Sequence, residues 1–276
     1  MCNTLPEGEA ILNSTHIEIG ISAVLSGPDG AYNTNNNAAT ILAIQDVNAS
    51  PDVLPGINLI PTFSDDGKDF GYGFLSAFCL GKRGVPVIHG PSYSGATTGA
   101  ATIARTMVIP IVATTATSPT LNSRDESNGY PTLSRVIISD EFQGAALAKI
   151  AVEFGWKQVV TMNVAQDVYT SGLSLAFAAS AESEGVNIVL RQSMGKSDTG
   201  DIARVVLNQI EASGSRIIFA FLYPEQVEVL LPIAKSLGMV GPGWVWVGCD
   251  GSRIFQSEGK GNVDASCVFV PLIKLK

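Results

Sequence analysis

The sequence lacks an apolar segment long enough to cross a membrane. Its 276 residues contain no charge-free run of about 18 apolar residues, and the longest candidate, residues 108–116, is interrupted by Pro110. The first residues also lack the basic and apolar regions of a signal peptide. We therefore expect either an intracellular protein or one whose targeting segments are not in this chain.

Cysteine is scarce and histidine scarcer, with four and two residues. Cys2, Cys79, Cys249 and Cys267 show no C-x-x-C spacing, which excludes the usual zinc and thioredoxin motifs. Four cysteines allow two disulfides without requiring them. No metal site is predicted.

Two triplets have the form of N-glycosylation acceptors. Asn13-Ser14-Thr15 is a good acceptor sequence, whereas Asn48-Ala49-Ser50 is followed by Pro51 and is a poorer one. Because such triplets also arise by chance, they favour secretion only slightly.

Basic charge is in deficit, with 17 Lys and Arg against 25 Asp and Glu and a net charge of −8. The basic residues are scattered, which argues against nucleic acid or an anionic membrane as a partner. The 46% hydrophobic content is enough for one large core or for two lobes of about 100 to 150 residues. We predict two lobes.

Strand-like and helix-like segments alternate along the chain. The predicted strands are residues 17–25, 57–63, 85–88, 109–113, 133–137, 158–162, 186–190, 216–222 and 245–247. The predicted helices are residues 37–47, 70–80, 96–106, 141–154 with Asp140 as its cap, 173–184, 201–212 and 225–237. This alternation is typical of right-handed β-α-β units in a parallel sheet.

A polar segment, residues 118–131, interrupts the alternation, and we predict the lobe boundary soon after it. The predicted fold is α/β, with two doubly wound parallel sheets joined by a hinge. Lobe 1 comprises residues 1–138 and lobe 2 residues 139–266. Residues 267–276 would begin a return crossover toward lobe 1, so that we expect the fold to be truncated at its C-terminus.

Ligands of doubly wound sheets bind beyond the carboxyl ends of the strands. Between strand 85–88 and helix 96–106, Ser94 offers a hydroxyl beside free amide groups and the positive end of a helix, which suits a carboxylate or phosphate. A serine at this place can equally be a plain helix cap. The hydroxyls of residues 114–118 suit a zwitterion or, alternatively, a simple turn.

A second group of candidates follows two later strands. Tyr223 and Asp250 could hold an ammonium group through a cation–π contact and an ion pair, or be a rim tyrosine and a capping aspartate. Asp65 and Asp66 precede Gly67 and predict a solvated turn rather than a paired acid and base.

Signals for catalysis are few, and we predict that the chain is not an enzyme and has no cofactor. Residues 90–94 approach the nucleophile elbow G-x-S-x-G, but Ser94 replaces the final glycine. His16 and His89 are poorly placed for a triad, and the phosphate-binding glycine motifs are absent.

Several segments in order resemble the extracellular ligand-binding (Venus flytrap) domain of class C G-protein-coupled receptors, most closely the GABA-B type, within the type I periplasmic-binding-protein family. They span roughly residues 17–272 and comprise residues 43–48, 52–55, 90–94, 118–121, 130–135, 154–157, 168–171, 190–193 and 216–223.

The resemblance implies a two-lobed clamp that closes on an amino acid or related small acid. Ser94 and Thr117 fall on lobe 1 hydroxyls that bind the ligand carboxylate, and Thr115 on a position that contacts ligand through its backbone. On lobe 2, Tyr223 matches a tyrosine that closes over the ligand, and Asp250 an aspartate that binds its amine. Tyr169 lies within one position of a further aromatic contact.

The likeness also implies a dimer formed through lobe 1, a transmembrane signalling region in the full-length protein and a place on the extracellular side of the plasma membrane. The chain departs from the GABA-B type at Tyr93, which replaces a loop cysteine, and at Ile137, which replaces a histidine. It also has no tryptophan in residues 27–32. A solute-binding protein of an amino-acid ABC transporter is the alternative, and a doubly wound enzyme a third. The sequence leaves open the ligand, the effector and the cysteine pairing.

Overall fold

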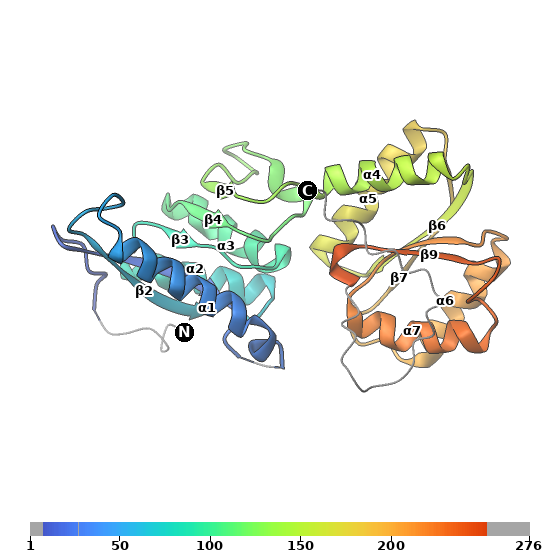
Figure 1. Ribbon diagram of the computed structural model, residues 1–276, viewed down its shortest axis with the longest axis horizontal. Helices are drawn as coiled ribbons and strands as arrows, with labels where there is room; N and C mark the ends of the chain where they lie inside the picture. The colour runs from blue at the N-terminus through green and yellow to red at the C-terminus, as the bar shows by residue number, and fades with distance from the viewer. Residues whose placement is uncertain (1–7, 27, 253–276) are drawn as a thin grey trace. The chain divides into compact units, whose positions relative to one another are not determined.

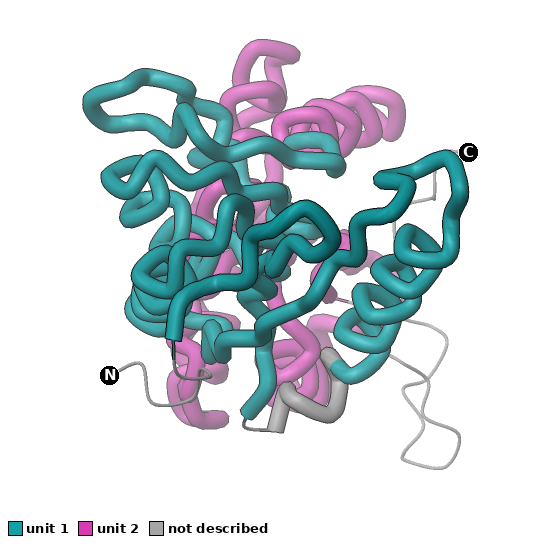
Figure 2. The backbone as a smooth tube through the Cα atoms, turned by 90° about the vertical axis from the view of Figure 1, so that its left-hand side faces the viewer, with its two compact units in different colours: residues 1–139 teal, residues 140–276 magenta. Residues whose placement is uncertain are grey.

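The computed structural model describes residues 8–26 and 28–252, apart from the side chains of residues 28–33. Figure 2 shows its two compact units: unit 1, Met1–Ser139, and unit 2, Asp140–Lys276. Cys2, Cys267 and the predicted crossover at residues 267–276 lie outside the described residues. Each unit has its own sheet.

Unit 1 contains a five-stranded parallel sheet in the order β2-β1-β3-β4-β5. Its elements, coloured blue to green in Figure 1, are β1 (His16–Ala23), α1 (Pro28–Ala49), β2 (Asn58–Asp65), α2 (Phe70–Arg83), β3 (Ile88–His89), α3 (Ser94–Met107), β4 (Ile111–Ala113), the 3-10 helix η1 (Pro119–Asn122) and β5 (Leu133–Arg135).

Unit 2 contains a four-stranded parallel sheet in the order β7-β6-β8-β9. Its elements are α4 (Asp140–Glu153), β6 (Gln158–Val164), α5 (Val168–Ser183), β7 (Asn187–Met194), α6 (Gly200–Ala212), β8 (Ile217–Phe221), α7 (Pro224–Ser236), β9 (Val245–Gly248) and the 3-10 helix η2 (Asp250–Ser252). Two parallel α/β sheets confirm the predicted fold class.

Helices cover both faces of the sheet in unit 1, α1 on one and α2 with α3 on the other (Figure 1). Ile21 of β1 packs with Ile44 of α1, whereas Ser22 hydrogen-bonds to Ser76 of α2 with 2.7 Å between the hydroxyl oxygens. Successive side chains of a strand point to opposite faces, so this alternation divides the unit into three layers.

Two glycines bring α2 and α3 of unit 1 into backbone contact. A Cβ atom added to Gly99 would lie 2.0 Å from the carbonyl oxygen of Phe70, and one added to Gly73 would lie 2.2 Å from that of Ala96. Neither helix can carry a side chain there. The close packing fixes the position of α3, whose first residue is the predicted ligand-binding Ser94.

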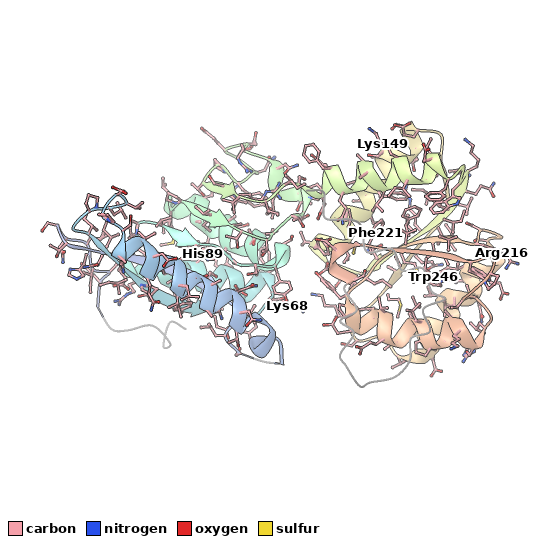
Figure 3. The ribbon with its side chains drawn as sticks, viewed as in Figure 1. Lys68, His89, Lys149, Arg216, Phe221 and Trp246 are labelled. Atoms are coloured by element: carbon pink, nitrogen blue, oxygen red, sulfur yellow. The ribbon has the colours of Figure 1, made fainter. Side chains whose placement is uncertain are left out.

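Unit 2 places α6 and α7 on one face of its sheet and α4 and α5 on the other. Trp246 of β9 packs with residues of α6 and α7, while Phe219 and Phe221 of β8 pack with those of α4 and α5. Figure 3 labels Phe221 and Trp246 within this unit. The ring of Phe177 stacks on that of Phe219 with 4.2 Å between centroids, so aromatic side chains join the aliphatic ones on this face of the sheet.

The elements differ from the prediction mainly at their ends. Helix α1 begins at Pro28 rather than at residue 37, because proline suits the first turn and the exposed residues 34–36 carry no apolar periodicity. Strand β3 begins at Ile88 rather than residue 85, because Pro86 has no amide to donate to a ladder. Asp140 is the first residue of α4 rather than the cap before it.

Candidate functional site

Each sheet reverses its strand order at one point, and the predicted site residues follow strands near it. In unit 1 the reversal lies between β1 and β3, and in unit 2 between β6 and β8. At such a point the loops that leave the two neighbouring strands run in opposite directions. The edge of the sheet where the strands have their carboxyl ends, here called the carboxyl edge, is the usual ligand-binding place beside that point in doubly wound sheets. Ser94 follows β3 and Tyr223 follows β8.

Ser94 is the first residue of α3 and is 4% exposed. Its Oγ accepts a hydrogen bond from the amide of Ser118 at 3.2 Å, which ties the loop after β4 to the helix. A hydroxyl that accepts one bond still has a proton to donate. The first amide of α3 that makes a helical hydrogen bond is that of Thr97, which donates to the carbonyl of Tyr93 at 2.8 Å. The amides of residues 94–96 lie before the first helical hydrogen bond.

Thr115 and Thr117 lie in the loop that follows β4. The Thr115 hydroxyl is exposed and donates to the carbonyl of Ser92 at 2.7 Å. Thr117 is half-buried, and within the described residues its hydroxyl makes no hydrogen bond. The structure thus brings Ser94, Thr115 and Thr117 to one edge of unit 1.

Arg135 fixes the conformation of this loop. Its Nη1 donates to the carbonyls of Ala116 at 3.1 Å and of Ser118 at 3.0 Å, the two residues that flank Thr117. Its Nη2 bonds to the side-chain oxygen of Asn122. Arg135 was not among the predicted site residues, and only its place in the matching segment 130–135 pointed to it.

The turn after β2 contributes charge to the same edge. The Nζ of Lys68 lies 4.7 Å from the centre of the Tyr93 ring, next to Ser94, and Figure 3 labels Lys68 at this end of the unit. The prediction of a solvated turn at Asp65 and Asp66 is wrong for Asp66, which is fully buried. Burial raises the pKa of the Asp66 carboxyl to about 6.

In unit 2 two tyrosine–carboxylate pairs lie side by side. The hydroxyl of Tyr169 donates to Asp250 and accepts from the amide of Gly251 at 3.1 Å. The hydroxyl of Tyr223 donates to both oxygens of Asp167 at 3.2 and 3.3 Å. The two rings are 5.8 Å apart, so all three predicted residues of this unit gather at one edge.

The residues around Asp250 fix the orientation of its carboxylate. Tyr169 is 9% exposed, and burial together with the nearby Cys249 and Asp250 raises its pKa, which keeps its hydroxyl protonated as a donor. Gly251 is required for this approach, because a Cβ there would lie 2.7 Å from the Tyr169 ring. Asp250 itself is exposed and can receive a ligand.

Asp167 was not among the predicted site residues. Its carboxylate caps α5 by accepting from the amide of Thr170 at 2.9 Å, and Lys196 lies 3.8 Å away. The predicted helix began at residue 173, five residues late, which hid an aspartate at the helix start.

The cysteines and titratable groups offer little other chemistry. Cys79 is disulfide-bonded, and Cys249 is a buried free thiol whose pKa is raised by burial. Within the described ranges, no three His, Cys, Asp or Glu side chains gather as a metal site. In the same ranges no helix is long and apolar enough to cross a membrane.

A family model described as the receptor family ligand binding region matches residues 35–262, most of the chain. The chain belongs to this family. The receptor ligand-binding region is the type I periplasmic-binding-protein-like fold that the resemblance implied, and the match covers the candidate residues of both units.

Relatives of this ligand-binding region include proteins described as glutamate receptors and one described as metabotropic glutamate receptor-like. Glutamate receptor 3.1 of Oryza sativa subsp. japonica is 27% identical over 212 residues, which are 77% of this chain and 22% of the relative. Metabotropic glutamate receptor 6 of Rattus norvegicus is 26% identical over 247 residues, covering 78% and 28%. Metabotropic glutamate receptor-like protein E of Dictyostelium discoideum is 26% identical over 170 residues, covering 59% and 20%. The chain spans between a fifth and three tenths of these relatives.

Proposed function

We propose that this chain is the ligand-binding part of a class C receptor on the extracellular side of the plasma membrane. It binds an amino acid or related small acid without turning it over. The observation that supports this most directly is the contrast between the two carboxyl edges. Unit 1 presents hydroxyls and helix amides, which suit an acid, whereas unit 2 presents carboxylates and aromatic rings, which suit an amine.

The acid end of the ligand is assigned to unit 1. Ser94 has a proton to donate, Thr117 has a hydroxyl without a described partner, and the amides of residues 94–96 point out of the helix end. A carboxylate placed there would receive several charge-assisted hydrogen bonds and the field of the α3 dipole. Thr115 contributes through its backbone, because its hydroxyl already bonds to Ser92.

The amine end is assigned to unit 2. Asp250 is an exposed carboxylate oriented by Tyr169, and the ring of Tyr223 beside it offers a cation–π face. In this arrangement Tyr169 acts mainly by orienting Asp250, because its hydroxyl already donates to Asp250 and accepts from the amide of Gly251.

A ligand with both groups would favour a state in which the two units engage it together. Ligand shifts such an equilibrium only by the contacts that one state has and the other lacks. In the full-length protein this shift would pass to a transmembrane region and to a partner subunit bound through lobe 1. A receptor of the GABA-B type is the narrowest form of this proposal, which leaves the identity of the ligand open. A solute-binding protein of a transporter would use the same contacts without that membrane region.

The first experiment is a thermal-shift screen of the standard L-amino acids and 4-aminobutyrate, because a ligand that binds only the folded state raises the melting temperature. Calorimetric titration of the strongest stabiliser then compares Ser94→Ala with Thr102→Ala. The Thr102 hydroxyl bonds to Thr98 on the same helix, two turns away, and is a matched control.

We expect Ser94→Ala to weaken binding by about 1 to 3 kcal/mol, the loss for a hydrogen bond to a charged group, and Thr102→Ala to leave it unchanged. Equal affinities for the two variants would remove Ser94 from the site. Absence of any stabilising amino acid would count against the proposed ligand class.

A further inference from the structure

The acceptor triplet Asn13-Ser14-Thr15 forms the tip of a tight hairpin before β1. Leu12 and Ile17 pair as an antiparallel bridge, and the amide of Asn13 donates to the carbonyl of His16 at 2.9 Å. All three residues of the triplet are exposed. The turn therefore presents the asparagine side chain to solvent on a fixed backbone.

Every described hydrogen bond to the Asn13 side chain goes to its oxygen. Oδ1 accepts from the amide of Thr15 at 2.9 Å, from the Thr15 hydroxyl at 3.0 Å and from the amide of His16 at 2.8 Å. The amide nitrogen, Nδ2, makes none within the described residues. A substituent on this nitrogen would therefore break none of these bonds in the folded chain.

The second triplet is placed quite differently. The Nδ2 of Asn48 donates to the carbonyl of Leu59 at 3.0 Å, and its Oδ1 accepts from the amide of Leu59 at 2.7 Å. These two bonds connect the end of α1 to β2. A substituent on this nitrogen would displace α1 from the strand, and the following Pro51 further restricts the triplet.

We propose that Asn13 is a glycosylation site, which accepts one N-linked oligosaccharide when the chain enters the secretory lumen, and that Asn48 does not. Nδ2 attacks the anomeric carbon of a lipid-linked oligosaccharyl diphosphate. The new nitrogen–carbon bond forms as the carbon–oxygen bond to the diphosphate breaks, the lipid diphosphate leaves, and Nδ2 gives up one proton to the transferase.

The site is compatible with the proposed function, on whose extracellular location its use in the cell depends. Asn13 precedes the start of β1, whereas the candidate ligand contacts follow the carboxyl ends of strands. Strand β1 has eight residues, so the two edges are about 25 Å apart. A glycan at Asn13 would leave the ligand edge of unit 1 open.

The test is translation of the chain behind a cleavable signal sequence in the presence of endoplasmic-reticulum microsomes. We expect one discrete increase in mass that peptide N-glycosidase removes. Asn13→Gln and Thr15→Ala should abolish it, Thr15→Ser should retain it, and Asn48→Gln should leave it unchanged. Retention of the glycan in Thr15→Ser would show that its loss in Thr15→Ala reflects the missing hydroxyl and not a failure to fold.

An unmodified wild-type chain, or a glycan that persists in Asn13→Gln, would overturn the proposal. Expression of the full-length protein in a secretory host separates this result from the proposed location. Modification of Asn13 behind the added signal sequence but not in the full-length protein would support the site and count against the extracellular receptor.

Discussion

The two units share one architecture but differ in the side chains that fill it. Unit 1 packs α2 against α3 through Gly73 and Gly99 and has a core of aliphatic residues, whereas unit 2 adds buried phenylalanines and a tryptophan to its aliphatic core. The carboxyl edges differ in the same way, hydroxyls in one and tyrosines with carboxylates in the other. In unit 1 the glycines let the backbones of α2 and α3 approach, while in unit 2 two tyrosines bring their hydroxyls to the carboxylates.

The two units differ most strongly in how deeply one ion pair of each is buried. Glu18 in β1 is fully buried and bonds to Arg83, Thr62 and the amide of Ile11, while in unit 2 the ion pair between Arg191 and Glu182 is one whose two side chains are both half exposed. Removing one partner of a buried pair leaves an unpaired charge, which costs far more than losing an exposed pair.

We therefore expect Arg83→Met to lower the free energy of unfolding by about 3 kcal/mol or more, and Arg191→Met by less than about 1 kcal/mol. Urea unfolding followed by circular dichroism measures both. All three tryptophans, Trp156, Trp244 and Trp246, lie in unit 2, so fluorescence reports that unit separately. Similar losses for the two variants would remove this contrast between the units.

The same pair sets the acid dependence of unit 1. Arg83 lowers the pKa of Glu18 from 4.5 to about 2, so its stabilisation is complete above pH 4.5 and is lost as the pH falls toward 2. In Arg83→Met the largest cause of this lowering is removed, and burial, which raises the pKa, then opposes the remaining hydrogen bonds from Thr62 and Ile11, so the loss of stability with falling pH should become smaller. An unchanged pH profile in the variant would contradict the assignment.

Helix packing gives a smaller contrast. Gly99→Ala places a Cβ 2.0 Å from the carbonyl oxygen of Phe70, and Gly144→Ala in unit 2 places one 2.6 Å from the amide nitrogen of Phe177. We expect a loss of about 2 kcal/mol for the first and a smaller one for the second. Gly95→Ala is the control on α3, because a Cβ there meets nothing within 4 Å. The measurement is the melting temperature of each variant. A lower melting temperature for Gly144→Ala than for Gly99→Ala would contradict the expectation that unit 1 has the tighter helix packing.

Helix ends give the smallest effect. In unit 2 each α-helix is followed by a glycine with positive φ, at Gly155, Gly185, Gly214 and Gly238. In unit 1, α3 ends instead at Val108, with φ of 57° and a β-branched side chain that is 78% exposed. Val108→Gly should stabilise unit 1 by about 1 kcal/mol, measured by calorimetry, and Gly214→Ala should destabilise unit 2 by a similar amount. Destabilisation by Val108→Gly would mean that the valine has a contact of its own.

Much of the fold could be predicted because its signal is local. Apolar runs such as residues 217–221 and helical spacing such as that of residues 200–212 indicate strands and helices without any knowledge of their neighbours. Prediction failed where the local pattern was weak, as in the polar start of α1. It failed also at Asp66, where an aspartate beside glycine is solvated in most turns but here is covered by the fold.

The sequence by itself determined the two parallel α/β sheets and placed Ser94, Thr117, Tyr223 and Asp250 after strands, because strand order along the chain and the right-handed crossover leave few alternatives. Only the tertiary structure decided which side chains fix these residues. Tyr169 bonds to Asp250 across 81 positions, Asp167 to Tyr223 across 56, and Arg135 to the loop around Thr117 across 17 to 19. Contacts between residues so far apart depend on how the elements pack in space, which no local pattern of residues encodes.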